Sequence, residues 1–173
     1  MQLEHLAAVE PIEQISFPSP RSTVLYRSEL EKNQLGHYYV IEPVPTKAPS
    51  LPPLLAYGGY WLTDDEAHVI VIATAPAWRR LRLGQWLLLE LINTARYQGA
   101  RAMTLEVRQH NTSAQQLYLG LGFTEVGVHK RYYRDTGEDA HLLTLFDLDG
   151  GAVWRPLSAQ LAALRATYAA HDE

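Results

Sequence analysis

The segment from Val69 to Gln85 constrains the fold of this chain more than any other. It reads V-I-V-I-A-T-A-P-A-W-R-R-L-R-L-G-Q, in which an apolar β-branched run stops at Pro76 and an arginine-rich loop follows. Because a leucine-rich helical pattern begins directly afterwards, the segment predicts a buried strand, a loop and a helix. The first amides of a helix have no intrahelical partner, and the helix dipole adds positive charge there. With Arg79, Arg80 and Arg82 beside them, these amides favour a ligand that carries phosphate.

Composition and charge exclude several classes of protein. With 173 residues, 47% of them hydrophobic and 20% charged, the chain is long enough for one well-buried core. The net charge of -4 gives no global attraction to nucleic acid, so we expect no direct nucleic-acid partner. The absence of cysteine excludes disulfides and thiolate nucleophiles, and the histidines form no metal-ligating pattern, so we expect no metal. No apolar run approaches the roughly 20 residues that span a bilayer, and we expect a cytoplasmic protein without a membrane partner.

The chain before this segment predicts two helices and an antiparallel meander of strands. Ser22 is a favourable N-cap, and residues 33–36 stop the helix that it begins. The elements expected in this part are a short strand at 2–6, a short helix around Val9, Ile12 and Ile15, a helix at 23–32, strands at 38–42, 54–62 and 66–74, and a surface loop at 43–53 that holds five prolines.

The chain after this segment predicts a βαβ crossover and then more strands. A helix from Leu83 to about Gln98 separates the strand at 66–74 from one at 102–107, so these two strands are expected to be parallel and in one sheet. The further elements expected are a helix capped by Asn111, strands at 123–133 and 141–148, and an amphipathic helix from Trp154. The predicted fold class is α/β of the α+β type, with a mixed, mostly antiparallel sheet of six or seven strands and helices on both faces.

Comparison with known phosphate-binding motifs reduces the number of possible ligands. The chain has no G-x-x-x-x-G-K followed by Ser or Thr, and the single glycine in the loop is too few for G-x-G-x-x-G. The run A-P-A-W-R-R-L-R-L-G-Q-W-L-L instead resembles the acetyl-CoA loop of the GNAT N-acetyltransferases. The strings L-E-V-R-Q-H-N-T-S-A-Q-Q-L-Y-L-G-L-G-F and K-R-Y-Y resemble the bacterial ribosomal-protein-alanine N-acetyltransferases, which acetylate the N-terminal amine of a small-subunit ribosomal protein. The resemblance covers residues 54–148 and, loosely, residues 16–33.

This resemblance implies a domain organisation, a co-substrate and a site. It implies a single GNAT-like domain over residues 1–150, with residues 151–173 as a C-terminal helical extension docked on the domain or on a partner. Acetyl-CoA is the implied co-substrate, and the N-terminal peptide of a protein is the implied partner. Glu106 matches the general base of the family, Tyr118 matches its general acid, and Arg21, Arg131 and Tyr132 fall at substrate positions. The positions that match cofactor-binding residues are Ile72, Ala73, Thr74, Arg79, Arg80, Leu81, Arg82, Leu83, Gly84, Gln85 and Asn111.

Several of these assignments have alternatives in the sequence. From spacing alone, Glu106 is the polar side of a half-covered strand and Tyr118 is a core residue, and only the combination with the phosphate loop and Asn111 favours catalytic roles. Glu66 and His68 are rival bases, because strand alternation points them the same way. Arg82 stands where the family has a glycine, and we expect it to adopt an ordinary helical φ with its side chain pointing outward. The alternative is that its guanidinium reaches a phosphate of CoA.

The proposed residue types suit direct attack of an amine on a thioester, which needs a base, an acid and no cysteine. A free α-amine has a reference pKa near 7.7 to 8.0 against about 10.4 for lysine, which favours an N-terminal amine as acceptor. The alternatives left open are acetylation of lysine, a polyamine or another small amine, and a CoA-binding module without activity.

Overall fold

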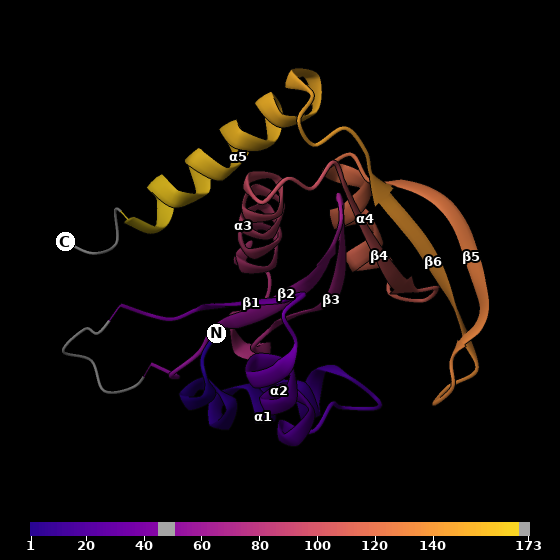
Figure 1. The fold of residues 1–173 in the computed structure, drawn as a ribbon. Coiled ribbons are helices and arrows are strands. Elements are labelled where there is room, and N and C mark those ends of the chain that lie inside the picture. Colours follow the sequence, from indigo (N-terminus) through magenta and orange to yellow (C-terminus); the bar gives the residue numbers. More distant parts are fainter. Residues whose placement is uncertain (45–50, 170–173) are drawn as a thin grey trace.

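One mixed six-stranded sheet supports the described part of the chain, residues 1–44 and 51–169 of a computed structural model (Figure 1). The order across the sheet is β1-β2-β3-β4-β6-β5; β3 and β4 are parallel, and the other neighbours are antiparallel. The strands are β1 (Gly36–Ile41), β2 (Ala56–Thr63), β3 (Glu66–Thr74), β4 (Ala102–Arg108), β5 (Thr124–Tyr133) and β6 (Glu138–Leu145). The predicted fold class, with its central parallel pair, is confirmed.

The helices lie on both faces of the sheet (Figure 1). They are α1 (Leu6–Ser16), α2 (Thr23–Lys32), α3 (Leu83–Tyr97), α4 (Thr112–Gly120) and α5 (Gly151–Ala169), with short 3-10 helices at Leu3–His5 and Pro76–Trp78. Helices α1 and α2 bury Val9 and Tyr26 against Tyr57 of the sheet. Helices α3 and α5 share a second core on the opposite face, which includes Leu87 and Leu161. In the described residues, no helix is both long enough and apolar enough to cross a membrane.

Local signals for helix ends are confirmed at both predicted caps. The Ser22 hydroxyl accepts a hydrogen bond from the Leu25 amide at 3.2 Å, and Asn111 Oδ1 accepts one from the Ala114 amide at 3.2 Å. Gly99 follows the end of α3 with a φ of 98°, a conformation that glycine adopts at little cost. These ends therefore depend on interactions within a few residues.

The predicted strand at 2–6 is wrong, and the predicted starts of the last strand and of the C-terminal helix are each three residues late. Residues 2–6 are not a strand, because the His5 side chain accepts the Gln2 amide at 2.7 Å and closes a 3-10 turn that leads into α1. The last strand begins three residues before the predicted 141, because Glu138 pairs with Tyr133 across a tight turn that contains Gly137 at a φ of 70°. Residues 45–50 of the predicted loop and residues 170–173 of the predicted extension lie outside the described part.

A β-bulge in β3 prepares the site. Gly59 pairs with Val71 and Tyr60 pairs with Val69, so Ile70 is an extra residue that faces no partner on β2. Next to the bulge, β2 has a glycine because Tyr38 of β1 leaves no room for a side chain. A Cβ on Gly59 would lie 2.4 Å from Cδ1 of Tyr38. The bulge leaves the Ile70 carbonyl available for a contact outside the ladder.

Candidate active site

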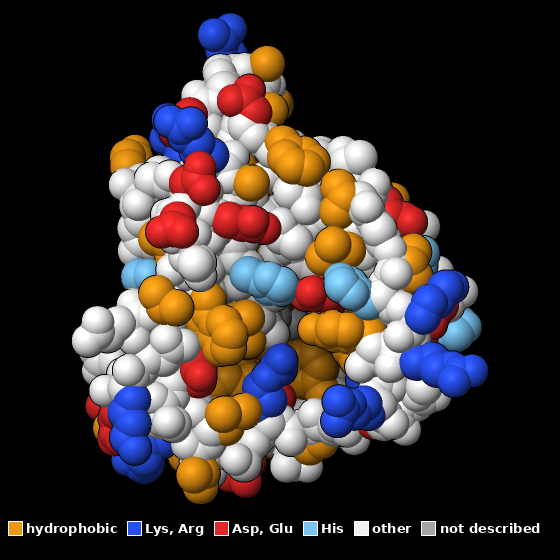
Figure 2. Space-filling model, turned by 45° about the vertical axis from the view of Figure 1, so that its right-hand side comes forward, with side chains coloured by type: hydrophobic (Ala, Val, Ile, Leu, Met, Phe, Trp, Pro, Cys, Tyr) orange, Lys and Arg blue, Asp and Glu red, His pale blue; other side chains and the backbone are white. Residues whose placement is uncertain are grey.

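The two parallel strands separate in the middle of the sheet, and the site lies where they part. They pair from Glu66 with Ala102 to Val69 with Leu105, and beyond that point β3 pairs only with β2 and β4 only with β6. Two hollows, of about 790 and 570 Å³, meet at this split. Figure 2 shows a face of the molecule that is hollowed near its centre, with hydrophobic, basic, acidic and histidine side chains around the opening. The residues that line both hollows are Ser16, Phe17, Ile72, Asn111 and Tyr118.

The smaller hollow, which we call the cofactor hollow, collects nearly all of the predicted cofactor residues. All of them except Leu81 line it, together with Ser113, Ala114 and Leu117 of α4. Along one wall, residues 72–74 of β3 pair with β2 on one side and have no strand on the other within the described chain. An extended ligand with amide groups can pair with such an edge, so this wall fits a pantetheine arm.

The arginine-rich loop forms the other end of the cofactor hollow. Arg79 fixes the loop, because its guanidinium donates to the Thr74 carbonyl at 3.2 Å and to the Ser16 hydroxyl at 3.0 Å. The first amide of α3 that bonds within the helix is that of Trp86, which donates to the Arg82 carbonyl at 2.9 Å. The amides of residues 83–85 precede it, so they have no partner within the helix and form the positive end of the helix dipole. Amides and cations of this kind fit the phosphates of CoA.

The expectation of an ordinary φ at Arg82 is wrong. Arg82 has a φ of 62° and Arg80 a φ of 67°, both in the left-handed region, where a non-glycine residue costs about 1–2 kcal/mol. The Arg82 side chain is exposed and donates through Nε to Oε1 of Gln85 at 3.0 Å, so it lies back along the start of α3.

Glu106, on the wall of the larger hollow, forms a close pair with His68, which lines a neighbouring hollow. Glu106 is the first residue of β4 beyond the split, and its Oε2 lies 2.6 Å from Nε2 of His68 on β3. The hydrogen bond to Glu106 raises the pKa of His68 above its usual value, against the opposing effect of burial. Glu66, the other rival base, instead accepts a hydrogen bond from the Thr104 hydroxyl at 2.6 Å. The site therefore contains a carboxylate and an imidazole joined by a hydrogen bond.

Tyr118 lies at the junction of the two hollows. Its ring is buried on α4, and the ring centroids of Tyr118 and Phe123 lie 5.9 Å apart, so packing in the core fixes its position. Burial raises the pKa of Tyr118 to about 12, with a further contribution from Tyr133. The phenol is therefore protonated at neutral pH and is a donor at the point where the two hollows meet.

Of the three predicted substrate residues, the structure places two on the wall of the larger hollow and one away from it. Arg21 lines the larger hollow and donates to the free Ile70 carbonyl at 3.0 Å, while its own amide donates to the buried Glu13 carboxylate at 2.7 Å. Tyr132 lines the same hollow and a neighbouring one of about 470 Å³ that Arg21 and His68 also line. The structure does not bring Arg131 to either hollow, because an irregularity in β5 gives it a φ of 52° and holds its amide on Asp139.

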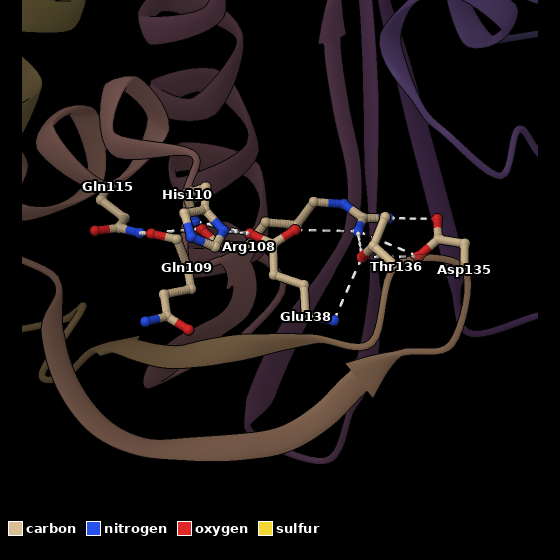
Figure 3. A network of polar contacts seen from close by, with 7 residues as sticks. All are labelled: Arg108, Gln109, His110, Gln115, Asp135, Thr136 and Glu138. Atoms are coloured by element: carbon tan, nitrogen blue, oxygen red, sulfur yellow. Dashed lines mark hydrogen bonds and ion pairs between the residues drawn. The ribbon is translucent and has the colours of Figure 1, made fainter.

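A polar network that the sequence did not indicate holds the wall containing Tyr132. Arg108, at the end of β4, reaches across to the β5–β6 turn and donates to Asp135 at 2.7 Å and to Thr136 at 3.0 Å (Figure 3). Glu138 accepts from Arg108 at 3.4 Å and from the His110 amide at 2.7 Å. Hydrogen bonds to Arg108 lower the pKa of Asp135, so the network stays ionised at neutral pH. These partners lie 27 to 30 residues away in sequence, which is why spacing gives no sign of them.

The fold and the site together define an acetyltransferase of the GNAT class. Residues 6–123 match the model of the Acetyltransferase (GNAT) family, and the chain belongs to that family. As a member it is an acetyl-CoA-dependent N-acetyltransferase, and the residues of the cofactor hollow fit that co-substrate.

Its relatives carry a more particular name. The chain is 36% identical over 143 residues, 83% of its own length and 90% of the relative's, to a Bacillus subtilis protein named "putative ribosomal protein bS18-alanine N-acetyltransferase". It is 40% identical over 83 residues to the Escherichia coli K12 ribosomal protein bS18-alanine N-acetyltransferase, a match that spans 47% of this chain and 56% of that protein. The crystal structure of the ribosomal-protein-S18-alanine N-acetyltransferase from Escherichia coli superposes with a TM-score of 0.72 at 28% identity, over 85% of this chain and 90% of that one.

Proposed function

We propose that this enzyme transfers the acetyl group of acetyl-CoA to the N-terminal α-amine of a protein, with Ala or Ser as the first residue. The relatives cited above are named for acetylation of an alanine of ribosomal protein bS18, and the acceptor that we favour is a bacterial ribosomal protein in the cytoplasm. The observation that carries the proposal is Glu106, which lines the larger hollow where it meets the cofactor hollow at Tyr118 and which lies 2.6 Å from His68.

The proposed mechanism is direct transfer. When bound, acetyl-CoA supplies a thioester whose carbonyl carbon is attacked by the amine. Glu106, with His68 beside it, accepts the proton that the amine loses as the new C–N bond forms. Since a free α-amine has a reference pKa of about 7.7 to 8.0, a carboxylate is a sufficient base, whereas lysine near 10.4 would need stronger help.

Tyr118 acts on the leaving sulfur. Its pKa of about 12 lies above the roughly 8.5 of an ordinary thiol, so complete proton transfer from this phenol to sulfur is uphill. Its O–H therefore stabilises the negative charge on sulfur by a hydrogen bond as the C–S bond breaks. Water at the mouth of the hollow then completes the protonation. Tyr118 thus matches the position of the family's acid and acts chiefly as a hydrogen-bond donor.

Mass spectrometry of product peptides tests the acceptor. Incubation with acetyl-CoA and peptides that begin with Ala, Ser or Met is expected to add one acetyl group at the N-terminus, fastest for Ala and Ser. Two further substrates test the alternative acceptors. They are peptides with a blocked N-terminus and a free lysine, and the polyamine spermidine. Equal or faster acetylation of the lysine or of spermidine would contradict the proposal.

A further inference from the structure

The catalytic scheme gives the C-terminal helix α5 no role. It follows the segment matched by the family model, which ends at residue 123. Its apolar stripe is buried in the same core as α3, through Leu157, Leu161 and Leu164. Arg165 holds both oxygens of Glu90 on α3, at 2.7 and 2.5 Å. The helix is therefore fixed along α3, the helix whose first turn borders the cofactor hollow.

Two side chains of α5 reach the phosphate loop itself. The Tyr168 ring stacks on the Trp86 ring, with ring centroids 4.8 Å apart and an angle of 7° between the ring planes. The Tyr168 hydroxyl donates to the Leu81 carbonyl. Gln160 accepts a hydrogen bond from the Gln85 side chain at 2.9 Å, and Gln85 in turn accepts from Arg82. Helix α5 therefore contacts Leu81 and Gln85 directly, and it contacts Arg82 through Gln85.

The contact with Leu81 fixes the direction of a neighbouring amide. The peptide bonds of the described chain are trans, so the Leu81 carbonyl and the Arg82 N–H point in opposite directions. Arg80 and Arg82 line the cofactor hollow, whereas Leu81 between them does not. With the Leu81 carbonyl held toward α5, the Arg82 N–H points away from α5. The left-handed φ values of Arg80 and Arg82 give this loop a conformation that an unsupported chain would seldom adopt.

We propose that α5 is a positioning element for the diphosphate of CoA, and that the Tyr168 hydroxyl holds the Leu81–Arg82 peptide with its N–H toward the cofactor. A loop held in its binding conformation before the ligand arrives binds more tightly, because less ordering accompanies binding. The inference extends the cofactor site and does not depend on which amine accepts the acetyl group.

Tyr168→Phe tests the proposal, because it keeps the stack on Trp86 and removes the donor. Calorimetry with CoA and no acceptor is expected to show a dissociation constant about three- to tenfold higher than that of the unmodified protein. In turnover, the KM for acetyl-CoA is expected to rise by a similar factor while kcat stays unchanged. Acetyl-pantetheine, which lacks the diphosphate, is expected to be used with the same kcat/KM by both proteins.

Tyr97→Phe is the matched control, since Tyr97 is 78% exposed on α3 and the change also removes one phenol hydroxyl. It is expected to leave CoA binding unchanged. The proposal is overturned if Tyr168→Phe binds CoA as tightly as the unmodified protein. It is also overturned if acetyl-pantetheine loses as much kcat/KM as acetyl-CoA, because the hydroxyl would then support the fold in general rather than the phosphate loop.

Discussion

At the scale of single residues, the Glu106–His68 pair determines when the base is available. The hydrogen bond raises the pKa of His68, so the imidazole keeps its proton to a higher pH than a free histidine does. While that proton is present, the Glu106 carboxylate is occupied by its hydrogen bond to the imidazolium and is less accessible to the proton of the amine. Activity that depends on this pair should therefore increase as pH rises through the raised pKa of His68 and fall as pH drops below it.

His68→Gln isolates this titration, because glutamine can still donate to Glu106 but does not ionise in this range. We expect the ratio of kcat/KM between the unmodified enzyme and the variant to fall as pH decreases from about 9 to about 6. Taking the ratio cancels the ionisation of the acceptor amine, which is common to both proteins. A ratio that stays flat over this range would show that His68 does not share the proton.

Tyr118 makes a second prediction at this scale. Tyr118→Phe preserves the packing against Phe123 and removes only the hydroxyl at the junction of the hollows. We expect kcat to fall about 10²- to 10³-fold, the usual loss for one donor to developing negative charge, with CoA affinity unchanged. Stopped-time assays at saturating acetyl-CoA give kcat, and calorimetry gives the affinity. Turnover at the unmodified rate by a variant that binds CoA normally would rule out the proposed role.

At the scale of elements, the β5–β6 hairpin is predicted to set acceptor binding. Arg108 ties its turn to β4 through Asp135 and lies 3.8 Å over the Tyr133 ring. Arg108→Gln removes this double attachment, and we expect the KM for the acceptor peptide to rise several-fold while CoA affinity is unchanged. Arg108→Lys is expected to restore little, because lysine lacks the planar fork that reaches two partners at once. An unchanged peptide KM in Arg108→Gln would show that the hairpin holds its position without this residue.

The phosphate loop carries a prediction about charge. Arg82→Gly relieves the left-handed φ but removes a cation that lines the cofactor hollow. We expect CoA to bind several-fold more weakly, with a smaller dependence on salt, because the phosphates lose one positive neighbour. Arg27→Gly on α2 is a charge-matched comparison outside the lining of the cofactor hollow. Tighter CoA binding by Arg82→Gly would mean that the strain of the loop outweighs the charge of Arg82.

The elements also show what the sequence can and cannot predict here. Helix α2 and its Ser22 cap follow from signals within a few residues, and strand alternation correctly placed Glu66, Glu106 and His68 on the same side. The distance between Glu106 and His68 depends on the parallel register of β3 and β4, which local patterns do not encode. The prediction of an ordinary φ for Arg82 is wrong because it rests on the preference of the side chain, whereas contacts from Ser16 and Tyr168, far away in sequence, hold this loop.

At the scale of the whole molecule, the split sheet depends on the helical layer of α1 and α2. Since β3 and β4 pair along only part of their length, other contacts must hold the β3 side of the larger hollow. The carboxylate of Glu13, 1% exposed, accepts hydrogen bonds from the hydroxyls of Tyr26 and Tyr57 and from the Arg21 amide. One buried acid therefore connects α1, α2 and β2 with the residue that contacts the bulge in β3.

Glu13→Ala tests this connection. It leaves two buried phenol hydroxyls and an amide without their acceptor, so we expect the free energy of unfolding to fall by about 3–5 kcal/mol. Glu10→Ala, an exposed change on the same helix, is expected to stay within about 0.5 kcal/mol. Chemical denaturation gives both values, and hydrogen exchange in Glu13→Ala is expected to accelerate in α1 and α2 before α3, which packs in the other core. Equal acceleration in α3 would show that the two faces unfold as one unit.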